Sequence, residues 1–312
     1  MNIVSQIEKP FEAVFLNVGR GHCAARIYNP ARGKSKGGGI VLAPGFGCTM
    51  DSGLFGYAEA FAKAGFYSLV FDYQGFGESP GGARQMVSVT KQKADWRAAI
   101  KTLRHHAGVD AHRIGLWGMD FSAGLAAHLA VEDGDIPAIA MQNPMLDFHL
   151  WRATLDFLRG QGASDTMKQL IDADAWPVSL GQRQANMLPL FKDETQTPSF
   201  YAMAAATMAD IAGPSWVNAV STKTFMRGHL HKNDPVGVTG DLADRLGVPV
   251  LVQMSRESSL VSHEAVHGFL RRMGPLARHS DYAGGHFDLL KKSSRKNAIG
   301  EAVAFFREIL GR

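Results

Sequence analysis

The sequence predicts an α/β fold built on a mostly parallel sheet, because short apolar strand patterns alternate with helical patterns along most of its 312 residues. Two strand patterns, at 39–43 and 66–72, are short and largely apolar, as in strands that helices cover on both faces. The helix expected between them, at 54–64, ends before Gly65, and glycine often closes a helix in the left-handed conformation. This alternation indicates crossover connections between parallel strands.

The same reading assigns the other elements in chain order. The first two strands, at 11–18 and 23–28, are joined by a turn that contains Gly19 and Gly21. Further elements are expected as strands at 113–117, 138–142, 248–253 and 277–282, and as helices at 94–105, 121–131 and 297–310.

The alternation stops near Asp147 and resumes only after residue 243. The stretch between has a helical pattern with several tryptophans and one tyrosine. The sequence therefore predicts one α/β core made of residues 1–146 and 243–312, in which helices flank an eight-stranded sheet. A helical cap at 147–242 is inserted after the sixth strand.

The composition is that of a globular protein, with 46% hydrophobic and 20% charged residues and a net charge of +4. No apolar stretch approaches the roughly 18 residues that span a bilayer, and the N-terminus lacks the apolar region of a secretory signal. Its two cysteines, Cys23 and Cys48, form no disulfide framework, and no metal-ligand spacing is present. We therefore expect a cytoplasmic protein without metal or cofactor that acts on a small molecule and binds neither nucleic acid nor membrane. Base rates favour a homodimer.

The most informative stretch is Gly118-Met-Asp-Phe-Ser-Ala-Gly124, where a strand, a tight turn and a small-residue helix are predicted. This is the context of a nucleophile elbow, the strained turn that exposes a nucleophilic side chain. In the pattern G-x-nucleophile-x-G the nucleophile is the second residue after the first glycine, which here is Asp120. Ser122 falls on a small-residue position instead. An aspartate at this point can also be a plain helix N-cap.

Three further motifs accompany the elbow in a fixed order. They are Pro44-Gly-Phe-Gly-Cys48, Phe71-Asp-Tyr-Gln-Gly-Phe-Gly-Glu-Ser79 and Gly284-Gly-His-Phe-Asp288. With these motifs the chain resembles the α/β-hydrolase superfamily, in particular its branch of hydrolases related to acyl-peptidases and esterases. The resemblance covers the chain outside the insertion and implies the fold predicted above.

The resemblance also implies roles for single residues. Asp120 takes the place of the nucleophile and His286 that of the catalytic histidine. The backbone N–H groups of Phe46 and Phe121 take the place of the oxyanion hole. Relatives usually carry a structural histidine where this chain has Pro44.

The acid of the catalytic triad departs from the family pattern. The column that holds it in relatives contains Ser258 here, with Glu257 just before it. Glu257 has a longer side chain and is our first candidate for the acid. Asp147 is the alternative, because some relatives with an aspartate nucleophile place their acid after the sixth strand.

An aspartate at the elbow changes the chemistry that the site favours. A carboxylate is already ionised at neutral pH and needs no base before it attacks. Attack on acyl carbon would give a reactive anhydride, whereas attack on an sp3 carbon gives a stable ester that histidine-activated water can cleave. Within the superfamily this is the chemistry of epoxide hydrolases and haloalkane dehalogenases. We therefore expect a hydrolase that works through a covalent alkyl-enzyme ester.

The two activities differ in the residue that stabilises the leaving halide or the opening epoxide oxygen. Haloalkane dehalogenases usually hold the halide with a tryptophan after the nucleophile, where this chain has Phe121. Epoxide hydrolases protonate the opening oxygen with cap tyrosines, and Tyr201 is the one tyrosine of the insertion. His229 and His231 are other candidate donors. The sequence thus favours epoxide hydrolysis, by analogy on a bulky polyketide-like substrate, with haloalkane dehalogenation as the alternative.

Other functions stay open at this stage. Asp120 or His286 could act as a general base in a lyase or cyclase without a covalent intermediate. A catalytically inactive protein could bind a small molecule under the cap. If Asp120 replaces a natural serine by engineering, the chain would be an ester hydrolase.

Overall fold

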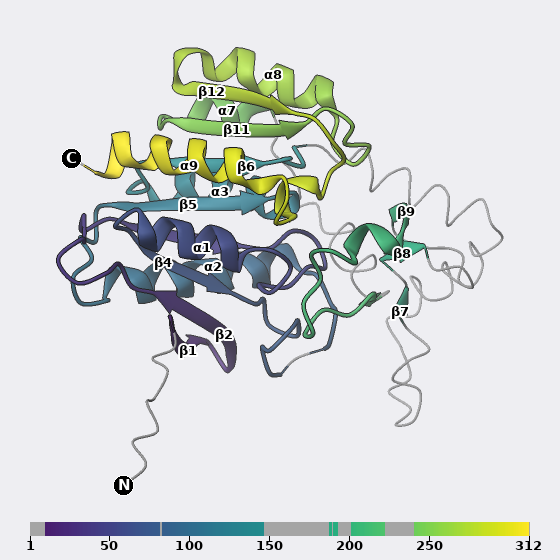
Figure 1. Cartoon of the computed structure of the whole chain (residues 1–312), viewed down its shortest axis with the longest axis horizontal. Helices are drawn as coiled ribbons and strands as arrows, with labels where there is room; N and C mark the ends of the chain where they lie inside the picture. Colours follow the sequence, from purple (N-terminus) through teal and green to yellow (C-terminus); the bar gives the residue numbers. More distant parts are fainter. Residues whose placement is uncertain are drawn as a thin grey trace, which may run out of the picture.

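The computed structural model describes residues 10–81, 83–146, 187–188, 190–192, 201–221 and 240–311. Within them lies an eight-stranded sheet with the order β1-β2-β4-β3-β5-β6-β11-β12 (Figure 1). Its strands are β1 (Glu12–Val18), β2 (Gly21–Tyr28), β3 (Gly39–Ala43), β4 (Tyr67–Phe71), β5 (Ile114–Met119), β6 (Ile139–Gln142), β11 (Val250–Ser255) and β12 (Ala277–Tyr282).

The sheet is antiparallel at one edge and parallel elsewhere. β1 and β2 form a hairpin, and β2 pairs antiparallel with β4. The other neighbouring strands pair in parallel, with registers such as Leu42 opposite Trp117 and Val252 opposite Met141. Every residue of β3, β5, β6 and β11 is buried, as expected for parallel strands that helices cover on both faces.

Helices cover the sheet on its two faces. The longer helices are α1 (Phe55–Lys63), α2 (Val89–Arg104), α3 (Phe121–Asp133), α8 (His263–Met273) and α9 (Arg295–Leu310). α1 and α9 contact each other on the near face in Figure 1, and α2 and α3 contact each other on the far face. Aromatic rings fill the space between the layers. Tyr57 of α1 packs on Trp117 with ring centroids 4.7 Å apart, and Trp96 of α2 packs on Phe71 at 5.7 Å.

The parallel strands all end on the same side of the sheet, which we call the carboxyl end, and the loops after β3, β5, β6 and β11 meet there. Described parts of the insertion lie beyond this end (Figure 1). They are the strands β7 (Met187–Leu188), β8 (Phe191–Lys192), β9 (Tyr201–Ala204) and β10 (Val220–Ser221) and the 3-10 turn η2 (Ala205–Met208).

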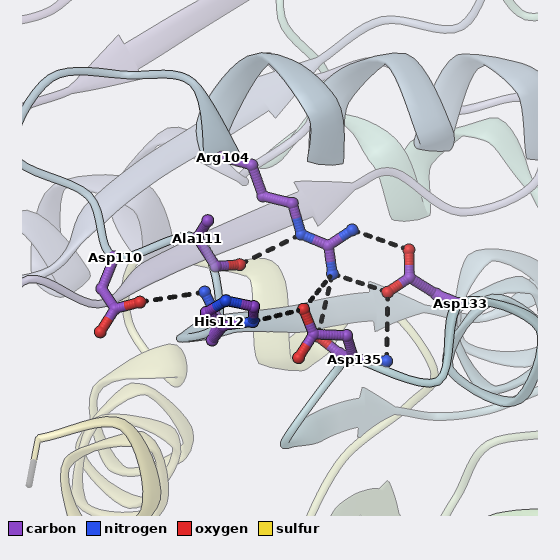
Figure 2. A network of polar contacts seen from close by, with 6 residues as sticks. All are labelled: Arg104, Asp110, Ala111, His112, Asp133 and Asp135. Atoms are coloured by element: carbon purple, nitrogen blue, oxygen red, sulfur yellow. Dashed lines mark hydrogen bonds and ion pairs between the residues drawn. The ribbon is translucent and has the colours of Figure 1, made fainter.

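At the opposite end of the strands, a polar cluster joins α2 to α3 (Figure 2). We call it the Arg104 cluster. It consists of Arg104, Asp133, Asp135 and His112. The Arg104 guanidinium donates to both oxygens of Asp133, at 2.9 and 2.6 Å, and to the carbonyls of Ala111 and Asp135. His112 Nδ1 lies 2.8 Å from the Asp135 carboxylate.

The fold class predicted from the sequence is confirmed, including the eight-stranded, mostly parallel sheet flanked by helices. The bounds of the predicted elements agree within a few residues, except that α2 begins five residues before its predicted start. Among the described residues, the prediction missed helix α8 and the second half of the short α7 (Gly240–Arg245), which begins inside the stretch predicted to be helical. The helical pattern predicted for 147–242 is wrong for residues 187–188, 191–192, 201–204 and 220–221, which form short strands. Among the described residues, no helix is long and apolar enough to span a membrane.

Candidate active site

Asp120 lies at the tight turn between β5 and α3, in a backbone conformation that non-glycine residues rarely adopt. Its φ is 55° and its ψ is −122°. Three contacts hold this turn: Asp120 N–H donates to Gln142 O, and Asp120 O accepts from Met145 N–H and Ala123 N–H. A Cβ on Gly118 would come within 2.6 Å of the α3 backbone, so glycine is required where strand and helix meet. The strained turn of a nucleophile elbow is therefore present.

The Asp120 carboxylate is fully buried and faces the loop after β3. Its Oδ2 accepts a hydrogen bond from the backbone N–H of Phe46 at 3.1 Å. Gly45 permits this approach, because a Cβ there would stand 3.0 Å from Oδ2. The side chain makes no capping hydrogen bond to α3. Asp120 thus points away from the helix it precedes, although the α3 N-terminus still favours its negative charge.

His286 comes from the loop after β12 and lies on the other side of the carboxylate. Its Nε2 is 4.0 Å from Asp120 Oδ1, and both side chains are fully buried. The Phe287 ring meets the imidazole edge to face, with centroids 4.7 Å apart. Burial lowers the pKa of His286 to about 3, so the imidazole is neutral at physiological pH.

The side chain that contacts the far nitrogen of His286 is Ser258. Its Oγ lies 2.8 Å from His286 Nδ1. Glu257, our first candidate for the acid, is exposed, and its backbone N–H donates to Gly284 O. The structure does not bring Glu257 to His286, because Glu257 is exposed on this turn whereas Ser258 is buried against the imidazole.

Asn143, directly after β6, holds the His286 loop in place, and sequence reasoning missed it. Its Nδ2 donates to His286 O at 2.6 Å and to Ser255 Oγ at 3.0 Å, and its Oδ1 accepts from Ser255 N–H at 2.6 Å. Asn143 has a φ of 42°, and asparagine is among the residues that tolerate this conformation. An asparagine at the carboxyl end of a buried strand was the available signal.

A second buried chain of hydrogen bonds fixes the loop that carries Phe46. Trp96 Nε1 donates to Tyr73 Oη at 2.8 Å, and Tyr73 Oη lies 2.6 Å from Ser122 Oγ. Ser122 in turn donates to the carbonyl of Pro44. Ser122 therefore links the elbow to the loop after β3.

Cys48, in the same loop, has surroundings that disfavour a reactive thiolate. It is fully buried, and burial together with the nearby charge of Asp120 raises the pKa of its thiol. The thiolate form that would react is therefore disfavoured.

The described part of the insertion packs over the carboxyl end of the sheet. Leu190 lies against Gly47 of the loop after β3. Phe191 contacts Phe287 edge to face at 5.4 Å, directly beside His286. The insertion thereby contributes to the apolar environment of the imidazole.

The structure describes some of the other site residues predicted from the sequence, and others lie outside the described residues. Phe121 follows Asp120 at the start of α3, and its ring meets that of Phe46 edge to face at 5.8 Å. The backbone of Tyr201 lies in β9, paired with Phe191. Asp147, His229 and His231 lie outside the described residues. Within the described ranges no group of three metal-ligating side chains is found.

Comparisons with known proteins agree with this fold. No family model matches the chain. The quorum-quenching protein AidA of Acinetobacter baumannii is 26% identical over 296 residues, covering 92% of this chain and 91% of that protein. The thiohydrolase aneE of Aspergillus aculeatus is 33% identical over 165 residues, and this match covers 53% of this chain and 48% of the fungal protein.

Among solved structures, the α/β hydrolase GrgF from Penicillium sp. sh18 superimposes with a TM-score of 0.75 at 17% identity. The match covers 97% of this chain and 100% of that one. Fold, strand order and the four motifs thus agree with one another, and the chain has the fold of the α/β hydrolases.

Proposed function

We propose that this α/β-hydrolase-type enzyme opens an epoxide by attack of the Asp120 carboxylate on carbon, through a covalent ester that water then cleaves. The observation that carries the proposal is the different surroundings of the two carboxylate oxygens. Oδ2 accepts a hydrogen bond from Phe46 N–H, whereas Oδ1 lies on the side of His286. This asymmetry supports charge stabilisation at Oδ2 and attack by Oδ1.

The first half of the reaction forms the ester. Asp120 Oδ1 bonds to the epoxide carbon as the carbon–oxygen bond of the ring breaks. The electron pair goes to the epoxide oxygen, which takes a proton from water and leaves hydroxide. A carboxylate can do this without a base, which suits an imidazole kept neutral by burial.

The second half cleaves the ester. His286 takes a proton from water as the water oxygen attacks Asp120 Cγ, and negative charge develops on Oδ2, where Phe46 N–H already donates. Collapse releases the diol with Oδ1, and the diol takes the proton back from His286. The new carboxylic acid gives its proton to the hydroxide from the first half, which restores Asp120.

The test is intact-protein mass spectrometry of His286→Gln mixed with a panel of epoxides and haloalkanes and quenched with acid. Removing the base should stop the reaction at the ester, so the mass should rise by one epoxide on the Asp120 peptide. The double variant His286→Gln/Asp120→Asn is the matched control and should gain no mass. An adduct that lacks the halogen would indicate haloalkane dehalogenation instead. No adduct on Asp120 with any compound would contradict the covalent route.

Hydrolysis of a thioester or ester is a second candidate, favoured by the likeness to a thiohydrolase over half of the chain. In that case His286 or Asp120 would activate water directly, because attack by a carboxylate on acyl carbon gives an anhydride. A single turnover in 18O-labelled water distinguishes the candidates. The covalent route puts 18O into Asp120 and none into the first product, whereas activated water labels the acid product at once. A lyase or cyclase would incorporate no 18O at all.

A further inference from the structure

His286 lies between two polar groups whose chemistry differs from that of a serine triad. Ser258 Oγ is 2.8 Å from Nδ1, and Asp120 Oδ1 is 4.0 Å from Nε2. In a serine triad a carboxylate stands at Nδ1, and because a carboxylate only accepts, it forces the proton onto Nδ1. A hydroxyl can donate or accept, so here the position of the imidazole proton has to be found from the surroundings.

The surroundings of Ser258 favour donation. The residue is buried, and His286 Nδ1 is the one hydrogen-bond partner that its hydroxyl has within the described ranges. If Nδ1 carried the proton, Ser258 Oγ would accept and its own hydroxyl proton would be left without an acceptor there. If Ser258 donates to an unprotonated Nδ1, both groups are satisfied.

The surroundings of Nε2 favour a proton on that nitrogen. It faces a buried carboxylate, and the N–H dipole is attracted to that charge whereas a lone pair is repelled by it. Phe287 and the fully buried position oppose a doubly protonated ring. Both nitrogens therefore indicate the same neutral tautomer.

We propose that His286 rests with its proton on Nε2 and that Ser258, by donating to Nδ1, is the positioning residue that selects this tautomer. His286 then points a donor at the side of Asp120 where a substrate reacts. If the proposed function holds, on which this consequence rests, Nε2–H donates to the epoxide oxygen as charge develops on it. This is the electrophilic role for which the sequence offers Tyr201 as one candidate.

The second half of the reaction needs an unprotonated Nε2, and a hydroxyl partner permits it. Ester formation removes the charge of Asp120, so the attraction that holds the proton on Nε2 is lost. Ser258 can then turn its hydroxyl and accept from Nδ1. One proton leaves Nε2 for water as another arrives at Nδ1 from water, so the exchange balances. A carboxylate at residue 258 would allow only the second arrangement.

The tautomer can be measured on the resting enzyme by 15N NMR of the histidine ring nitrogens. The His286 signals are identified by their loss in His286→Gln, because the chain has 12 histidines. At pH 7 we expect a protonated Nε2 and an unprotonated Nδ1, with Ser258→Thr keeping this pattern and Ser258→Asp moving the proton to Nδ1. A wild-type spectrum with the proton on Nδ1, or with both nitrogens protonated, would overturn the proposal.

The kinetic consequence is tested by following ester formation and ester hydrolysis separately by rapid quench. Ser258→Asp should slow ester formation about tenfold and leave hydrolysis equal or faster, with Ser258→Thr close to wild type. Acceleration of both halves would show that Nε2–H is not the donor. Failure of the covalent route is distinguishable, since no ester would then form on Asp120 in wild type or in either Ser258 variant, while the NMR measurement still tests the tautomer.

Discussion

Helix α3 has an aspartate at each end, and the two carboxylates differ in burial and in the groups that contact them. Asp120, before its first residue, is fully buried, accepts from a backbone N–H and faces a neutral imidazole. Asp133, its last residue, is 22% exposed in its side chain and forms two hydrogen bonds with the Arg104 guanidinium. The helix dipole favours the first carboxylate and opposes the second. Arg104 offsets that opposition.

The same difference holds for other carboxylates at the two ends of the sheet. Asp72, after β4 at the site end, accepts from the backbone N–H groups of Met50 and Glu78. Asp135, in the Arg104 cluster, contacts a guanidinium and an imidazole. Backbone N–H groups thus contact the carboxylates at the site end of the sheet, whereas cationic side chains contact those of the Arg104 cluster. Under the proposed function, one end of α3 holds a reactive carboxylate and the other end a carboxylate that joins α2 to α3.

Removing the charge of Asp120 should have the largest effect on activity and little effect on stability. With the substrate that labels Asp120, we expect Asp120→Asn to lose about 10⁴-fold or more in turnover, because the nucleophile is gone. The melting temperature should stay equal or rise, since a buried charge is removed and asparagine tolerates the positive φ. The measurements are initial rates and thermal unfolding. Turnover near that of wild type, with mass spectrometry excluding deamidation back to aspartate, would refute the role of Asp120.

Breaking the link between the elbow and the loop after β3, which carries Phe46, should have the next largest effect. In Ser122→Ala the bonds to Tyr73 and Pro44 are lost, so the Phe46 N–H is no longer fixed. We expect turnover to fall about 10- to 100-fold, less than for removal of an oxyanion donor. Ser68→Ala is the matched control, because Ser68 is a buried serine whose hydroxyl donates to Ala58 O away from the site. Both variants should lose about 1–2 kcal/mol of stability. Equal activities of the two would mean that Ser122 is only structural.

How far the sequence predicts this arrangement depends on which interactions fix each part. The order of strands and helices follows from the periodicity of apolar residues, and Asp120 and His286 are found by motifs tied to strand ends. The partner of His286 could not be predicted, because a single step along a turn decides whether Glu257 or Ser258 points inward. No periodicity governs that step. Asn143 escaped for a related reason, since its contacts join strand ends that are distant in sequence.

The pH dependence of stability should reveal the buried carboxylate of Asp72. Burial raises the pKa of Asp72 to about 7, above the value of about 4 for an unfolded chain. Between these values the native state holds a proton that the unfolded state has released, so this group's contribution to stability falls as pH rises from about 4 to 7. In Asp72→Asn this slope disappears. We expect the variant to gain roughly 2–4 kcal/mol relative to wild type between pH 4 and pH 8 in urea unfolding. Parallel pH profiles of the two proteins would contradict a raised pKa.

Changing the Arg104 cluster should have the smallest effect. Its contribution to stability should decrease as pH falls, whereas that of Asp72 decreases as pH rises. The Arg104 guanidinium lowers the pKa of Asp133, so the pair stabilises the fold above the unfolded pKa of about 4 and stops doing so as pH falls through the lower, folded value. Arg104→Met should therefore cost about 1–2 kcal/mol at pH 7, less at high salt and less below pH 4, with turnover unchanged. Arg97→Met is the control, because Arg97 is 54% exposed beside Glu132 and should contribute less. A loss of turnover in Arg104→Met at full folding would show that the two ends of α3 are coupled. The Arg104 cluster would then contribute to activity and not only to the stability of the fold.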